Sequence, residues 1–412
     1  MLDLRCSHLT ARPIPGNSFL RNAGSGAFVG PVQSLVTMPS LPPPRREWLE
    51  VAETVAIAAA GGIAFSWIGV PAGLVSGSIL SVACAALAGR PVKVPLWLAR
   101  ICFVVVGMLL GAVVTPETLR GVVTWPLSIA LLTLSTVATI VATTSYLRFA
   151  HRWDMLSALL GASPGSMAQV IALAADFGTD LRGIAIVQTM RVLVVAIGLP
   201  SGLALFGLAA GGVIVVVGPP LVASLPELAL IAAVSTATAV AMARIRFPGG
   251  ILFGAMAGSA LLHGTGLVHA VPPWWAGSSA VVVLGAVVGA RFANSTPRML
   301  LDYVWAALGS SAVAIAVASF FVVLVTSYLP FRAADVAIAF APGAQDTMMV
   351  LALALHLDPV YVGAHHLVRF LIVTFTVALS ARRVAGRKVA ERKLTLPEPA
   401  RWKRPGQGTL DD

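Results

Sequence analysis

The sequence predicts an all-α polytopic membrane protein made of two inverted repeats, with about ten spanning helices and two broken or re-entrant segments. Three observations predict this fold. Of the 412 residues, 58% are hydrophobic and only 11% are charged, whereas a soluble domain carries about 25% charged residues. Apolar stretches of about 20 residues recur, and each is long enough to cross a bilayer as a helix. Finally, the second half of the chain repeats the first.

The repeat is clearest at an offset of 178 residues. SPGSMAQVIALAADFGTD (163–180) aligns with APGAQDTMMVLALALHLD (341–358), and Arg191 then aligns with Arg369. At the same offset VVVGMLLGA (104–112) aligns with VVLGAVVGA (282–290), and at 177 VPAGLVSGS (70–78) aligns with FPGGILFGA (247–255). Recurring Pro-Gly, Asp and Arg are not expected by chance in a chain rich in Ala, Val and Leu. They indicate an internal duplication.

The duplication sets the expected domain organisation. Residues 1–47 are rich in Pro, Gly and Ser and predict a disordered N-terminal extension, in which Met38 is an alternative start to Met1. Membrane repeat 1 is expected over 48–207 and membrane repeat 2 over 226–381. An apolar linker, 208–225, joins them, and a basic tail, 382–412, follows.

Each repeat is expected to contain five spans and one interrupted segment. The spans are 51–68, 72–88, 96–114, 125–147 and 181–206 in the first repeat, and 227–243, 249–263, 273–290, 301–328 and 359–380 in the second. The interrupted segments, 154–178 and 333–357, contain the Pro-Gly pairs. Proline removes a helix hydrogen bond and glycine relaxes the backbone, so both segments should break in the middle.

The positive charges predict that the repeats are inverted and that both termini are cytoplasmic. If the interrupted segments are re-entrant, eleven loop cations face the cytoplasm and two, Arg120 and Arg332, face outside; if they cross, the balance falls to seven against six. The positive-inside rule favours the first topology, and the basic tail agrees with it. The eleven are Arg45, Arg46, Arg90, Lys93, Arg148, Arg152, Arg182, Arg244, Arg246, Arg291 and Arg298.

The two breaks predict a binding site for a small solute. Backbone groups freed in hydrocarbon need protein or water partners, so such breaks typically line a cavity, and half-helix N-termini there attract anions. A packing kink is the alternative. The candidate substrate-binding residues are Ser163, Pro164, Gly165, Ser166, Gln169, Arg191, Pro342, Gly343, Gln345, Asp346, His365, His366 and Arg369.

The charged candidates have competing explanations. Asp346 follows the second break, where it either caps the half-helix or carries a coupling charge, and the first repeat has Ala168 there. Arg191 and Arg369 lie deep in their spans, so we expect them to pair with an acid or a bound anion rather than to snorkel. The acids considered are Asp346, Asp176, Asp180 and Asp358.

Other chemistries find little support in the residues. His365 and His366 precede Arg369 within about one turn, but adjacent helical side chains point about 100° apart, which suits one metal ion poorly; proton handling and structure stay open. The three cysteines are scattered, and phosphate-loop, dinucleotide and metalloprotease motifs are absent from the sequence. We expect no catalytic residue, metal or cofactor, and no direct nucleic-acid binding by the short tail.

The duplicated Pro-Gly block with its following Asp and buried Arg resembles the AbrB-like membrane family of Gram-negative bacteria, over about residues 50–380. Members are often labelled ammonia monooxygenase or membrane regulator of gene expression. The resemblance implies a multi-pass protein of the bacterial inner (plasma) membrane. The monooxygenase label would require a cluster of copper ligands, and the regulator label a nucleic-acid-binding or signalling module; the sequence contains neither.

The sequence leaves three candidate functions. The first is a secondary transporter of a small anionic or zwitterionic solute, by analogy with inverted-repeat carriers. The second is a membrane-embedded regulator of gene expression that acts through a partner. The third, an oxidase or monooxygenase, is disfavoured, so we expect no enzymatic activity. The expected partners are the lipid bilayer and the solute, with a homodimer left open.

Overall fold

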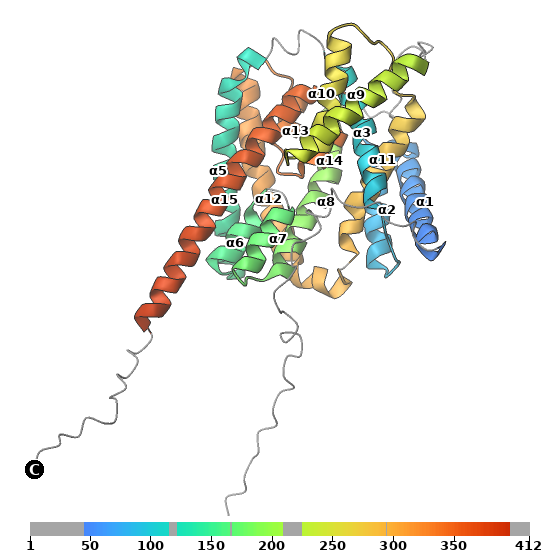
Figure 1. Ribbon diagram of the computed structural model, residues 1–412. Coiled ribbons are helices and arrows are strands. Elements are labelled where there is room, and N and C mark those ends of the chain that lie inside the picture. Colours follow the sequence, from blue (N-terminus) through green and yellow to red (C-terminus); the bar gives the residue numbers. More distant parts are fainter. Residues whose placement is uncertain (1–44, 115–121, 165–166, 209–224, 294, 396–412) are drawn as a thin grey trace, which may run out of the picture. The chain divides into compact units, whose positions relative to one another are not determined.

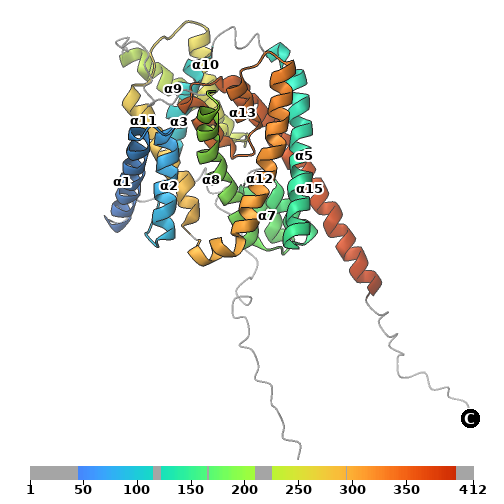
Figure 2. The same cartoon turned by 180° about the vertical axis from the view of Figure 1, so that it is seen from behind.

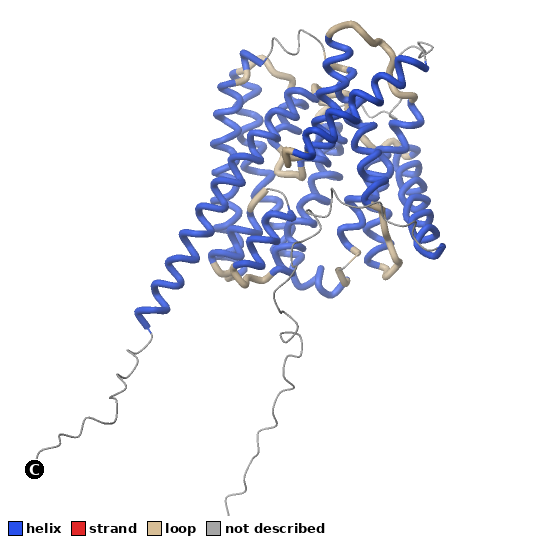
Figure 3. Tube along the Cα trace, viewed as in Figure 1, coloured by secondary structure: helices blue, strands red, loops and turns tan. Residues whose placement is uncertain are grey.

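The computed structural model describes residues 45–114, 122–164, 167–208, 225–293 and 295–395. These residues belong to one compact unit, Ser40–Asp412, and among them there are helices and loops but no strand (Figure 3). Nearly all of the expected extension and linker, and the end of the tail, lie outside the described residues.

The described helices form two sets in the same order. The first set is α1 (Arg45–Trp67), α2 (Gly73–Leu87), α3 (Leu96–Ala112), α5 (Pro126–His151), α6 (Met155–Ala162), α7 (Met167–Asp176) and α8 (Leu181–Leu205). The second is α9 (Leu225–Arg244), α10 (Gly250–Gly264), α11 (Trp274–Gly289), α12 (Pro297–Tyr328), α13 (Ala333–Phe340), α14 (Gln345–Ala354) and α15 (Pro359–Thr395). Short 3-10 turns, η3 (Val122–Thr124) and η4 (Ala290–Phe292), precede α5 and α12.

The predicted fold class is confirmed. Among the described residues, seven helices are long and apolar enough to cross a membrane, and three shorter apolar helices, α2, α3 and α10, accompany them. Together they correspond to the predicted spans, and each interrupted segment forms two half-helices, α6–α7 and α13–α14. One boundary differs: α15 continues to Thr395, so the first part of the expected tail extends the last helix.

The two broken segments lie toward opposite ends of the compact unit. In Figure 1, α6 and α7 lie side by side at the lower end, whereas α13 and α14 lie in the upper part, and Figure 2 shows the same from behind. Each broken segment therefore enters and leaves on one side, as the inverted topology requires.

The helices pack as two groups. We call α1–α3 with α9–α11 the scaffold group, because α2 packs along α1 and α11 while α10 packs along α9 and α3. We call α5–α8 with α12–α15 the hairpin group, in which α12 packs along α5 and α8. Contacts between the groups are much less extensive and involve mainly α14 against α2, α3 and α11.

The glycines that align between the repeats lie at the crossings of the scaffold group. A Cβ on Gly107 of α3 would lie 2.7 Å from the carbonyl oxygen of Leu252 in α10. The same atom on Gly289 of α11 would lie 2.7 Å from the carbonyl oxygen of Ile79 in α2. Small residues let membrane helices approach closely, and both crossings use them in this way.

The second alignment, at 177, coincides with a shared backbone feature. The residues before α2 and α10, Ala72 and Gly249, both adopt left-handed conformations, with φ of 50° and 63°. A non-glycine residue in this conformation costs about 1–2 kcal/mol, and Ala72 is buried there.

We predict that Gly107→Ala lowers the stability of the purified protein by about 1–3 kcal/mol, because the added methyl forces α3 and α10 apart. Thermal unfolding in detergent measures this. Gly198→Ala in α8 is the matched control, since nothing lies within 4 Å of its Cβ position. Equal unfolding temperatures for the two variants would contradict the packing argument.

Candidate functional site

The first break is held by a buried arginine. Helix α6 ends at Ala162, and the last carbonyl groups of a helix have no partner within it. The guanidinium of Arg191 in α8 donates to the carbonyl oxygens of Ala162 (3.0 Å), Ser163 (2.8 Å) and, more weakly, Gly161 (3.4 Å). Arg191 is only 3% exposed. Its positive charge therefore faces the negative end of the half-helix dipole.

One turn earlier, Gln188 completes this arrangement. Its amide nitrogen donates to the carbonyl oxygen of Leu160 at 2.9 Å. The break in the chain would otherwise leave the last carbonyl groups of α6 unpaired in hydrocarbon. Side chains of α8 donate hydrogen bonds to these groups.

The second break repeats this geometry with one changed residue. Arg369 of α15 donates to the carbonyl oxygen of Ala341 and to Nδ1 of His366. Nε2 of His366 lies 3.0 Å from the carbonyl oxygen of Ile338, which makes this nitrogen the protonated one and the ring neutral. His366 and Ile338 lie 178 residues after Gln188 and Leu160, so a histidine does in one repeat what an amide does in the other.

The partners of the arginines differ from the expected ones. Among the described residues, they are backbone carbonyls and a histidine, not carboxylates. Asp358 instead accepts hydrogen bonds from the backbone N–H of Val360 and Tyr361 at the start of α15. Asp180 accepts one from the N–H of Arg182 at the start of α8. The carbonyl ends of the half-helices thus supply the negative charge that we expected from acidic side chains. The side chain of Asp176, another candidate partner, is not among those that the structure describes.

The two breaks are neighbours at mid-depth. Arg191 lies ten residues after the start of the span Leu181–Leu205, and Arg369 ten residues after the start of Pro359–Ala381. Helix α14 of the second break packs against α8, the helix whose Arg191 holds the first break. Both breaks therefore meet near the middle of the hairpin group.

Several buried polar atoms at the breaks lack a hydrogen-bond partner in the described part of the chain. They are Oγ of Ser163, Nε of Arg191, Nε2 of Gln345 and Oγ1 of Thr347. Native structures satisfy nearly all buried polar groups, so each of these atoms is a candidate for a bond to water or a ligand, as are buried hydroxyls away from the breaks, those of Thr143, Thr144 and Ser235. Pro164, Pro342 and Gly343 form the adjoining backbone. Gly165, Ser166 and the side chain of Gln169 lie outside the description.

Asp346 has a partner that the sequence analysis did not identify. Its Oδ2 lies 3.1 Å from a guanidinium nitrogen of Arg291, and the two side chains are 34% and 22% exposed. Asp346 begins α14 in the hairpin group, whereas Arg291 lies in η4 directly after α11 of the scaffold group. This ion pair therefore joins the two groups. The equivalent residues in the first repeat are Ala168 and Val113, so the pair is present in one copy only.

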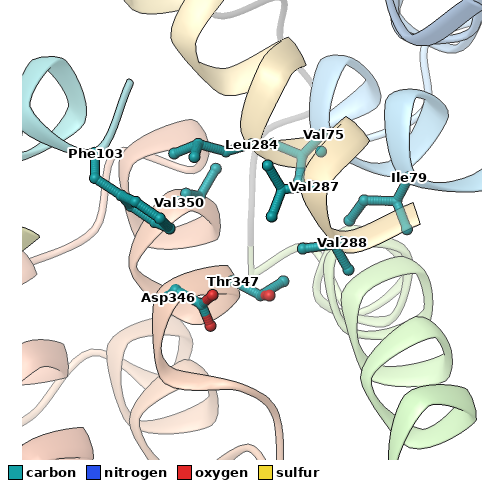
Figure 4. Close-up of a pocket in the computed structure, with 10 residues that line it drawn as sticks. Val75, Ile79, Phe103, Leu284, Val287, Val288, Asp346, Thr347 and Val350 are labelled. Atoms are coloured by element: carbon teal, nitrogen blue, oxygen red, sulfur yellow. The ribbon is translucent and has the colours of Figure 1, made fainter. Parts of the chain in front are cut away.

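A small pocket lies beside this ion pair (Figure 4). Apolar side chains of α2, α3 and α11, including Val75, Phe103 and Leu284, form most of its wall. Asp346 and Thr347 of α14 are its polar side chains. The pocket is thus located where the tip of the second hairpin meets the scaffold group.

The two adjacent histidines do not fit a copper site. Nε2 of His365 bonds Oγ of Ser128 at 2.8 Å, and its Nδ1 lies 2.8 Å from the carbonyl oxygen of Tyr361. Both nitrogens of His366 are also engaged, as described above. Within the described residues, no group of three or more His, Cys, Asp or Glu is arranged to hold a metal ion.

These features define an integral membrane protein of many spans, with two broken helices that enter from opposite sides. The comparisons with known proteins identify the family. The family model described as "Transition state regulatory protein AbrB" matches residues 74–385, and the chain belongs to this AbrB family.

Two relatives cover most of the chain. "Uncharacterized protein YhjN" of Bacillus subtilis (strain 168) is 24% identical over 348 residues, which are 77% of this chain and 89% of the relative. "Putative regulator AbrB" of Escherichia coli (strain K12) is 24% identical over 336 residues, which are 78% of this chain and 93% of the relative.

We predict that Arg369→Met destabilises the protein by about 3–5 kcal/mol, because it leaves the carbonyl end of α13 unpaired and removes the partner of His366. The temperature of unfolding in detergent measures the loss. Arg182→Gln, at an exposed position that begins α8, is the matched loss of one positive charge and should unfold like the wild type. If both variants unfold together, the arginine does not hold the break.

Proposed function

We propose that the protein is a secondary transporter of a small anionic or zwitterionic solute in the bacterial inner membrane, with both termini in the cytoplasm. The observation that carries this proposal is the meeting of two half-helix breaks from opposite sides, with buried polar atoms that lack hydrogen-bond partners among the described residues. Paired broken helices at mid-membrane are where inverted-repeat carriers bind their solutes.

The packing of the helices supports movement. Contacts within each group are extensive, whereas α14 provides most of the contact between them. Alternating access requires one bundle to move against another around a fixed site, and a sparse interface lowers the free energy of that motion.

A regulator of gene expression is the second candidate, and the names of the family and of one relative favour it. The family description and the Escherichia coli relative both refer to regulation. The basic residues after the last span would be the contact surface for a partner.

We predict flux of at least one solute when the full chain is reconstituted in liposomes and offered organic acids and amino acids under proton or sodium gradients. Uptake of radiolabelled solute measures it, with protein-free liposomes as the control. Absence of flux under every gradient would count against transport.

Deletion of residues 382–412 separates the two functions. A carrier keeps its flux, because the deleted residues follow the span Pro359–Ala381. A regulator loses its effect on expression in cells while the truncated protein stays in the membrane. Loss of flux in a truncated protein of unchanged abundance would contradict the prediction that transport does not need residues 382–412.

The proposed topology predicts that a tag inserted after Gly266, in the turn after α10, is accessible from outside the cell. Labelling of intact cells with a membrane-impermeant reagent measures this. A tag after Arg246, in the turn before α10, is the matched control and should react only after lysis. The opposite pattern would place both repeats in reversed orientation.

A further inference from the structure

The charges left available at the breaks are not those of an anion site. The guanidinium groups of Arg191 and Arg369 already donate to the carbonyl ends of α6 and α13. The charge that borders the pocket is the carboxylate of Asp346. A purely anionic solute in this pocket would meet a like charge, which is unfavourable at low dielectric.

Thr347 gives independent evidence for a polar ligand. Its side chain lines the pocket next to Asp346 (Figure 4), it is 2% exposed, and its hydroxyl has no partner in the described part of the chain. A buried hydroxyl beside a carboxylate offers two acceptors to a group that carries several N–H donors.

The pocket matches a small head group. It has room for about one water molecule, which is close to the size of an ammonium group. Its other walls are apolar, and the side chains of Val75, Phe103 and Leu284 enclose this space.

Arg291 is the natural competitor for this position. Its ion pair with Asp346 is partly exposed, and ion pairs of that kind contribute little net stability. A second cation can therefore replace the guanidinium at the carboxylate without a large loss of stability.

We propose, on the basis of the proposed transport function, that the solute is a zwitterion like a small apolar amino acid, whose ammonium group binds Asp346 and Thr347 in place of Arg291. Its carboxylate is recognised by the backbone N–H groups in the first turn of α14, where no side chain caps the helix. Binding then releases the ion pair that joins α14 to the scaffold group.

The test uses purified full-length protein and matched ligand pairs: alanine, valine and leucine against propionate, 3-methylbutanoate and 4-methylpentanoate, which lack only the amino group. Isothermal titration calorimetry measures the dissociation constants, and liposome uptake measures flux. We expect at least one amino acid to bind at least about tenfold more tightly than its des-amino partner, because the partner leaves Asp346 and Thr347 unpaired.

Three variants make the prediction specific. Asp346→Asn should weaken amino-acid binding at least about tenfold, whereas Arg291→Gln should tighten it several-fold because the competing cation is gone. A gain of affinity cannot result from misfolding. Arg332→Gln is the control, because Arg332 is exposed and pairs with a different acid, Asp335 (3.8 Å).

The outcomes distinguish this inference from the proposed function. The zwitterion site would be overturned if the wild type transports the des-amino acids and Asp346→Asn binds them with unchanged affinity. The protein would then be a transporter of anions. If Arg291→Gln binds amino acids more weakly and its unfolding temperature is unchanged, Arg291 does not compete with the solute for Asp346. If the wild type neither binds nor moves any member of this panel, the zwitterion site is overturned, while the wider liposome screen still decides whether the protein is a transporter.

Discussion

The rest of this structure depends on how a helix can end in the middle of a membrane. The carbonyl groups at the end of α6 and α13 have no partner within the helix, and hydrocarbon offers none. Arg191 and Arg369 supply charged donors from the neighbouring long helices. Because each arginine must reach its half-helix, α8 has to lie against α6 and α15 against α13.

Much of this architecture could be predicted from the sequence, because its signals are local or repeated. Apolar length predicts the spans, Pro-Gly predicts the breaks, and loop charge predicts re-entrant segments. The partners of the arginines could not be predicted in this way, because backbone carbonyls are not encoded by any residue type. Gln188 and His366 both bond a carbonyl oxygen near the end of a half-helix, but they differ in residue type. Comparison of the repeats by residue identity therefore does not identify them.

The pairing of Asp346 with Arg291 was hidden for a different reason. The two residues are 55 positions apart in the chain, on either side of α12 and α13. Neither has a charged equivalent in the first repeat, so comparison of the repeats shows an unpaired acid. Arg291 was interpreted only as a loop cation that sets topology. Its second role depends on the tertiary arrangement that brings η4 to the tip of the second hairpin.

The transport that we propose requires the site to stay intact while the two helix groups change their contacts. The interactions here divide along that line. The arginine, glutamine and histidine bonds that hold the breaks are buried and lie entirely within the hairpin group, so a movement between groups need not disturb them. The ion pair between the groups is partly exposed, and partly exposed pairs separate at little cost. A ligand can shift such an equilibrium only by the difference in its affinity for the two arrangements. A cation that competes with Arg291 for Asp346 provides that difference at the contact which has to break.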